Sequence, residues 1–137
     1  MIRYLLDTNV VSEVRKTRPH GAVLAWMAAL RPEQIFLSAV TIGELQDGVE
    51  LTRKQDVARA SEIEDWLSSL EISFAFLPMD TACFREWSRL MAGRPDSLRE
   101  DAMIAATARV LGLTVATRDE KDFRHLAVDI VNPFKSK

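Results

Sequence analysis

The feature that most constrains the fold is a set of five short apolar runs separated by longer segments with helical periodicity. The runs cover residues 2–6, 35–38, 74–77, 113–117 and 128–131. Apolar and polar residues do not alternate cleanly inside them, which is typical of strands covered on both faces. Strands that alternate with helices form right-handed βαβ units, so the sequence predicts an α/β fold with one parallel sheet between layers of helices.

The segments between the runs predict helices. Apolar residues recur at helical spacing in residues 23–30, 63–70 and 84–91. An Ala-rich segment from Asp101 to Leu111 is followed by Gly112, a common helix stop. No linker, repeat or low-complexity tract interrupts the pattern, so residues 1–137 are expected to form a single domain. The three tryptophans fall on apolar helix faces, where we expect the core or a subunit interface.

Composition limits the classes of protein and partner. The 137 residues contain no apolar run near the roughly 20 residues that a membrane span needs, and the single cysteine cannot form an internal disulfide. We therefore expect a cytoplasmic protein with no membrane partner. The formal net charge of −2 argues against a nucleic-acid partner on its own. We interpret one basic cluster, Arg15, Lys16, Arg18 and His20, as a solvated turn in preference to a binding surface.

Four acidic residues occupy positions at strand ends or predicted helix starts: Asp7, Glu44, Asp101 and Asp119. Each has a purely structural interpretation. Asp7 and Asp119 could cap helices. Glu44 has capping-box spacing from Thr41, and Ser97-Leu-Arg-Glu100 is a second such box, beside which Asp101 would only favour the helix dipole. Taken singly, the structural interpretation is favoured at each position.

The joint arrangement favours a metal site. Asp7 and Asp119 directly follow predicted parallel strands, so they lie at one sheet edge, and the helices whose first turns hold Glu44 and Asp101 begin near it. Converging carboxylates repel one another and raise each other's pKa unless a cation is present. An oxygen-rich site suits Mg²⁺, with Mn²⁺ as a possible substitute. Four neighbouring polar side chains could orient the acids or their waters: Thr8, Asn9, Ser38 and Thr117.

Such a site suggests a reaction class. Mg²⁺ held by Asp and Glu can activate a water and stabilise the charge on a phosphoryl group during in-line displacement. The sequence shows no Ser-His-Asp set and no reactive cysteine, and His20 and His125 lack ligand spacing and are expected on the surface. The residues alone therefore predict a metal-dependent hydrolase acting on phosphoryl groups.

Four sequence blocks, in order and in register, resemble the PIN-domain ribonucleases and, within them, the FitB-like branch of the VapC toxins: LLDTNVVSE, LSAVTIGEL, DAMIAATARVLGLTVATRD and DFRHLAVDIVNPF. The resemblance covers nearly the whole chain. It implies a single PIN domain over residues 1–137, a three-layer α/β/α fold and a five-stranded parallel sheet in the order 3-2-1-4-5.

The same resemblance implies roles for individual residues. Asp7, Glu44 and Asp101 would be the catalytic, metal-binding acids. The fourth acid is either Asp119 or Asp122, and Asp119 is preferred because it follows the strand directly. The charged segment RPDSLRED beside Asp101 departs from the family pattern, which leaves the fine geometry and the substrate preference open.

The resemblance also implies an activity and partners. It predicts a Mg²⁺-dependent endoribonuclease that hydrolyses RNA phosphodiester bonds as the toxin of a type II toxin–antitoxin pair. It further implies a homodimer and a small VapB-type antitoxin that blocks the active site within a hetero-oligomer.

Three alternatives compete with the nuclease. The chain could be a catalytically inactive PIN-fold interaction module. A phosphorelay receiver-like domain needs an Asp after its third strand, near Asp80 here, and a Lys after the fifth, where Asn132 and Pro133 stand. A haloacid dehalogenase-type phosphatase needs D-x-D where this chain has Asp7-Thr-Asn9. RNA cleavage with and without a chelator separates all three from the nuclease.

Overall fold

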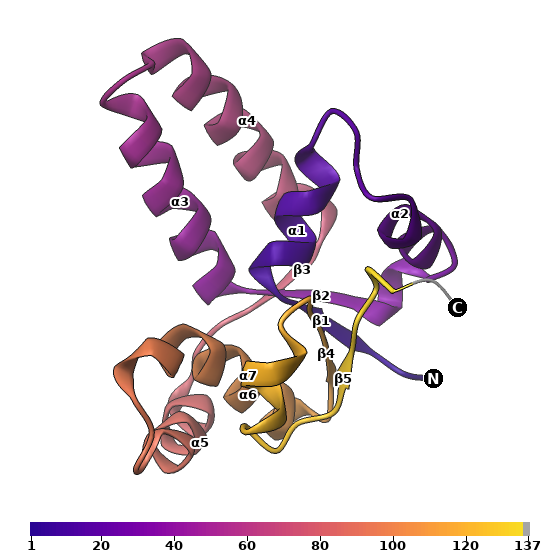
Figure 1. Ribbon diagram of the computed structural model, residues 1–137, viewed down its shortest axis with the longest axis vertical. Helices are drawn as coiled ribbons and strands as arrows, with labels where there is room; N and C mark the ends of the chain where they lie inside the picture. The colour runs from indigo at the N-terminus through magenta and orange to yellow at the C-terminus, as the bar shows by residue number, and fades with distance from the viewer. Residues whose placement is uncertain (136–137) are drawn as a thin grey trace.

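The computed structural model describes residues 1–135, which fold around one five-stranded sheet in the order β3-β2-β1-β4-β5 (Figure 1). The strands are β1 (Tyr4–Leu6), β2 (Ile35–Ser38), β3 (Ala75–Leu77), β4 (Thr114–Ala116) and β5 (Ile130–Val131). Every neighbouring pair is parallel. The predicted α/β class and strand order are confirmed. The first strand is shorter than its apolar run because exposed Ile2 precedes the first paired residue, Tyr4.

Seven α-helices alternate with these strands within residues 1–135: α1 (Thr8–Arg15), α2 (Gly21–Ala28), α3 (Ala39–Arg53), α4 (Val57–Ser73), α5 (Thr81–Met91), α6 (Arg99–Leu111) and α7 (Glu120–Arg124). Short 3-10 turns, Pro32–Gln34 and Asp96–Leu98, precede β2 and α6. Helix α6 ends as predicted at Gly112, whose φ of 70° is left-handed. The Leu113 amide then donates to the Ala108 carbonyl at 2.8 Å, satisfying an end carbonyl of the helix.

The sheet separates two apolar cores. Successive strand residues point to opposite faces, so Leu5 packs against α5, α6 and α7, whereas Leu6 packs against α1 to α4. Ile104 of α6 and Phe123 of α7 are fully buried on the first side. The second side includes Val49 of α3. These two cores make the predicted three-layer α/β/α arrangement, and their near-complete exclusion of solvent makes them the main stabilising element of the fold.

The start of α3 differs from the sequence prediction. Ser38 is its N-cap, and the Ser38 hydroxyl accepts a hydrogen bond from the Val40 amide at 3.0 Å. Thr41 is therefore buried inside the helix and is not a cap. The predicted Thr41–Glu44 capping box is wrong, and Glu44 lies in the second turn instead of the first. An earlier Ser competes better for the cap because it ends strand β2 directly.

Helices α3 and α4 form a long antiparallel hairpin that projects away from the sheet (Figure 1). The tryptophans are half-buried on helix faces, as Trp26 shows by packing edge-to-face on Tyr4 at 4.9 Å. Within residues 1–135, no helix combines the length and apolar character that crossing a bilayer requires.

Candidate functional site

Asp7 lies at the carboxyl end of the central strand β1 and is only 5% exposed. Three groups donate to its carboxylate: the Thr8 amide at 2.8 Å, Asn9 Nδ2 at 3.1 Å and Thr117 Oγ1 at 2.8 Å. Burial raises the pKa of Asp7, and the hydrogen bond from Thr117 opposes that rise. Asp7 is thus the N-cap of α1 and also a buried acid facing the end of β4. The interpretation of Asp7 as a helix cap is confirmed, and its role in a metal site stays a prediction.

Glu44 joins this group through threonine hydroxyls. The Thr8 hydroxyl donates to Glu44 Oε1 at 2.7 Å, and the Thr8 and Thr41 hydroxyl oxygens are hydrogen-bonded at 3.1 Å. Burial raises the pKa of Glu44, the Thr8 hydrogen bond opposes the rise, and repulsion from Asp7 adds to it. Sequence reasoning missed the supporting role of Thr41. The available signal was its spacing of three from Glu44, which places both side chains on one face of α3.

Asp101, Asp119 and Asp122 form the tightest acidic cluster, with one carboxylate oxygen from each lying within 4.8 Å of the others. Asp101 lies in the first turn of α6, as predicted. Asp119 is the N-cap of α7, and its Oδ1 accepts from the Asp122 amide at 3.4 Å. The sequence left Asp119 and Asp122 as alternatives for the fourth acid. The structure brings both beside Asp101, because one turn of helix separates them.

The environment of Asp101 is the most perturbed in this group. Its pKa rises from 3.8 to about 7, first through burial and then through repulsion from four other carboxylates: Asp7, Asp119, Asp122 and Glu44. Asp7 and Glu44 therefore lie near enough to the cluster for their charges to act on Asp101. Burial and the neighbouring Asp122 carboxyl also raise the pKa of Asp119.

Asp101 does not obtain this environment from a helix cap. Leu98 occupies the N-cap position of α6 and makes no side-chain capping bond. The predicted capping box from Ser97 to Glu100 is therefore wrong. A carboxylate in the first turn gains about 0.3–1 kcal/mol from the helix dipole. That gain is smaller than the combined cost of burial and repulsion that raises the pKa of Asp101.

The remaining predicted residues divide into two groups. Thr117 and Asn9 contact Asp7 directly, and Asn9 Nδ2 also lies 3.4 Å from Thr117 Oγ1. The Thr117 hydroxyl further accepts from the Asp119 amide at 2.9 Å, so it joins Asp7 to the start of α7. Ser38 instead bonds to its own helix, and its role in orienting an acid stays a prediction. Both histidines are exposed, as expected.

The donor set fits a hard divalent cation. Carboxylates with no sulfur or imidazole among them are the ligands that Mg²⁺, Mn²⁺ and Ca²⁺ prefer. A cation among Asp101, Asp119 and Asp122 would also remove the repulsion that raises the pKa of Asp101. The acidic edge of the sheet therefore has the chemistry of a divalent metal centre.

Comparison with known proteins agrees with this geometry. The PIN domain model matches residues 4–129. VapC ribonuclease Y4jK of Sinorhizobium fredii is 36% identical over 137 residues, 96% of this chain and 97% of that protein. Toxin FitB of Neisseria gonorrhoeae is 35% identical over 95% of this chain and 97% of its own. The chain belongs to the PIN-domain family, among its VapC ribonuclease toxins. The resemblance seen in the sequence blocks is confirmed.

The solved structure of FitAcB from Neisseria gonorrhoeae superposes on this PIN domain with a TM-score of 0.84 at 33% identity, covering 96% of this chain and 98% of that one. Receiver domains instead have the strand order 2-1-3-4-5. The observed order, with β3 at the edge, excludes the receiver alternative. Asp80, which a receiver would phosphorylate, here caps α5 by accepting from the Cys83 amide at 2.9 Å.

Proposed function

We propose that residues 1–137 act as a single PIN domain that cuts RNA internally at the acidic edge of the sheet. The metal is Mg²⁺, and Mn²⁺ can substitute. The observation that supports this most directly is the clustering of Asp101 with Asp119 and Asp122. Burial and repulsion from four carboxylates together raise the pKa of Asp101 to about 7. A fold that assembles such repulsion gains nothing from it unless a cation binds there.

The acids have different roles in this proposal. Asp101, Asp119 and Asp122 would hold the cation, with Asp7 and Glu44 completing its surroundings. The bound cation would lower the pKa of a coordinated water and neutralise charge on the phosphoryl oxygens. The protein's own donors keep the acids in place, as Thr117 and Asn9 do for Asp7 and Thr8 does for Glu44.

The test is cleavage of single-stranded RNA by the purified chain with Mg²⁺, with Mn²⁺ and with chelator. Asp101→Asn should remove most activity while preserving the fold, since even groups that only support a metal ligand contribute about 10–100-fold. Asp65→Asn, the same change on an exposed site of α4, should cut like the unmodified chain. Cleavage by Asp101→Asn at the unmodified rate, or cleavage that persists in chelator, would refute the metal mechanism.

A catalytically inactive interaction module is the surviving alternative. It predicts that the unmodified chain leaves RNA intact under every metal condition. The cluster of Asp101, Asp119 and Asp122, with Asp7 and Glu44 near enough to repel Asp101, favours the nuclease, because an inactive module has no need to retain mutually repelling carboxylates.

We also propose a small VapB-type antitoxin as the partner that holds the nuclease inactive. Solved relatives are described as complexes, among them FitAB bound to a DNA fragment. The antitoxin should present Arg or Lys toward Asp7 and Asp101, since a guanidinium pairs with a carboxylate and would replace the charge of the metal. Co-expression with the neighbouring gene should yield a hetero-oligomer with a much smaller protein. Recovery of only the free, active chain would contradict this.

A homodimer completes the proposal. Exposed apolar side chains remain on α5 and α6, with Phe84 at 46%, Val110 at 40% and Leu111 at 41% exposure. Light scattering of the purified chain should give twice the mass of one chain, and a concentration-independent single-chain mass would exclude the dimer.

A further inference from the structure

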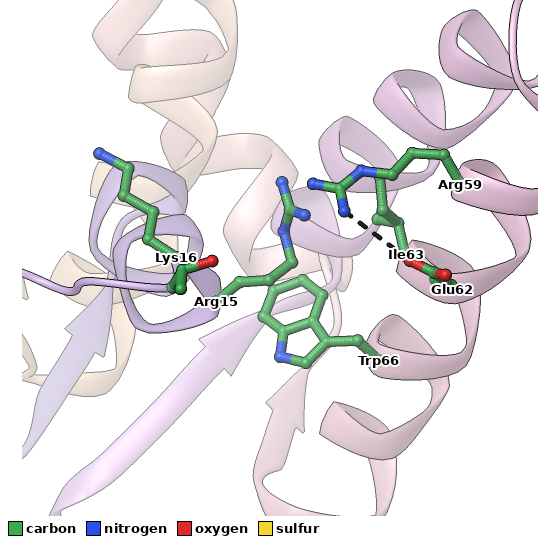
Figure 2. Close-up of a pocket in the computed structure, with 7 residues that line it drawn as sticks. Arg15, Lys16, Arg59, Glu62, Ile63 and Trp66 are labelled. Carbon is green, nitrogen blue, oxygen red and sulfur yellow. Dashed lines mark ion pairs between the residues drawn. The ribbon is translucent and has the colours of Figure 1, made fainter.

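The basic cluster interpreted from sequence as a solvated turn borders a pocket of about 410 Å³ between the end of α1 and the face of α4 (Figure 2). Arg15 and Lys16 come from the α1 side, and Arg59 and Trp66 come from α4. The Arg15 guanidinium stands over the Trp66 ring, 5.6 Å from its centroid. Exposure of Arg15 and Lys16 agrees with the sequence interpretation. The aromatic surface opposite them does not follow from it.

Positive charge is in excess in this pocket. Within residues 1–135, Arg15 forms no ion pair, and Arg59 has only a loose one to Glu62 at 3.7 Å. Figure 2 shows the guanidinium groups of Arg15 and Arg59 pointing toward one another across the pocket. Like charges in this arrangement favour an anion between them, and a guanidinium fits the oxygens of a phosphate with paired hydrogen bonds.

The pocket lies at the opposite end of α1 from the acidic site. Helix α1 extends from Thr8, which contacts Glu44, to Arg15, which is about 10 Å away at 1.5 Å per residue. A few nucleotides of a single strand can span a distance of this size. A strand cut at the acids can therefore reach the pocket.

A local cationic site is also needed on electrostatic grounds. The chain has a net charge of −2, and its acidic edge repels a polyanion wherever the carboxylates are not neutralised. Affinity for RNA comes mainly from phosphate contacts with Lys and Arg. Aromatic rings beside such cations add stacking with bases of single strands.

We infer that the pocket formed by Arg15, Arg59 and Trp66 binds a phosphate of single-stranded RNA on the same strand as the bond that is cut, a short distance along it. Arg15 and Arg59 contact the phosphate, Trp66 keeps the Arg15 guanidinium in place through its ring face, and an adjacent base can stack there. The inference rests on the proposed ribonuclease function and identifies a subsite for its substrate.

The first test measures binding without cleavage. Each variant is made in the Asp101→Asn chain, and a fluorescent single-stranded RNA is titrated at several salt concentrations with chelator present. Arg15→Gln and Arg59→Gln should each weaken binding and reduce the slope of log K against log salt by about 0.7 for each phosphate that is no longer neutralised. Arg15→Lys should recover part of the affinity. Arg85→Gln, the same charge change on exposed α5, should bind like the parent.

The second test ties the pocket to the acids through substrate length. In chains with intact Asp101, Arg15→Gln should raise KM and leave kcat unchanged for long RNA. For an RNA too short to extend from the cut bond to the pocket, Arg15→Gln and the unmodified chain should have equal KM. A KM effect that is the same at every length would overturn the inference, because the pocket would then not act at a distance along the strand.

The outcomes separate this inference from the proposed function. If the unmodified chain neither binds nor cuts RNA, the ribonuclease proposal fails and the subsite fails with it. If the unmodified chain cuts RNA while Arg15→Gln and Arg59→Gln match Arg85→Gln in slope and KM, only the subsite is refuted. Loss of a co-purified protein partner with unchanged RNA binding would assign the pocket to protein and also overturn the inference. Unchanged melting temperatures of the variants would show that any loss of RNA binding or rise in KM does not come from altered folding.

Discussion

Asp101→Asn should stabilise the metal-free protein at neutral pH, although it removes an acid from the first turn of a helix. A pKa that rises from 3.8 to about 7 on folding corresponds to roughly 4 kcal/mol of unfavourable free energy for the charged form. Asp101 is only half-buried, so solvent screening reduces this to about 2 kcal/mol. Losing the helix-dipole interaction removes up to about 1 kcal/mol. The net gain is about 1 kcal/mol, or roughly 4 °C in Tm for a domain of this size.

The stability change caused by Asp101→Asn depends on pH. Because the pKa of Asp101 is higher in the folded state, the penalty is absent below about 4, grows as pH rises through about 7, and is constant above that. Thermal unfolding with chelator, from about pH 3.5 to about pH 8.5, measures the difference between the variant and the parent on both sides of this range. Glu100→Gln changes a neighbouring acid of the same turn. It loses the dipole interaction and relieves only a minor repulsion with Glu44, so it should not stabilise the chain as Asp101→Asn does. If Asp101→Asn melts below the parent at about pH 8, by as much as Glu100→Gln does, the convergence of acids is refuted.

Three further predictions test other parts of the structure. Mg²⁺ at 100 Kd should stabilise the unmodified chain by about 2.7 kcal/mol in thermal unfolding at matched ionic strength, and Asp101→Asn should respond much less; an equal response would remove Asp101 from the metal site. Thr117→Val should lower the free energy of unfolding in urea by about 1.5–3 kcal/mol, since it deletes a hydrogen bond to the buried Asp7 carboxylate, and an unchanged midpoint would show that the bond adds nothing. Gly112→Ala should cost about 1 kcal/mol at a φ of 70°, whereas Gly48→Ala inside α3 should stabilise by about 0.5–1 kcal/mol, and changes of the same sign would contradict the assigned backbone conformations.

Much of the fold could be predicted because buried parallel strands are short, apolar and separated by helices. The strand positions and the stop at Gly112 follow from that pattern and are confirmed. Helix starts were harder to place, because Ser38 and Thr41 are both good caps and only the end of β2 decides between them. The order of the sheet came from the family resemblance, since periodicity alone does not specify which strands pair.

The site could be predicted only in part. Asp7 and Asp101 could be identified from the sequence, because their positions at a strand end and a helix start place them at one edge of the sheet. The sequence could not decide between Asp119 and Asp122, because they are one helical turn apart and both lie beside Asp101. The pocket beside Arg15 could not be predicted from the sequence, for a different reason. Its aromatic wall, Trp66, comes from a helix far along the chain.

The hydrogen bond from Thr117 to Asp7 joins residues that are 110 positions apart. Translation at about 5–20 residues per second therefore separates the synthesis of the two groups by roughly 5–20 s. Strand β1 has β2 as an early neighbour, but its second neighbour, β4, is made only after most of the domain. The acids consequently cannot assemble until β4 has left the ribosome. A growing chain therefore lacks the assembled acidic site while most of the domain is being translated.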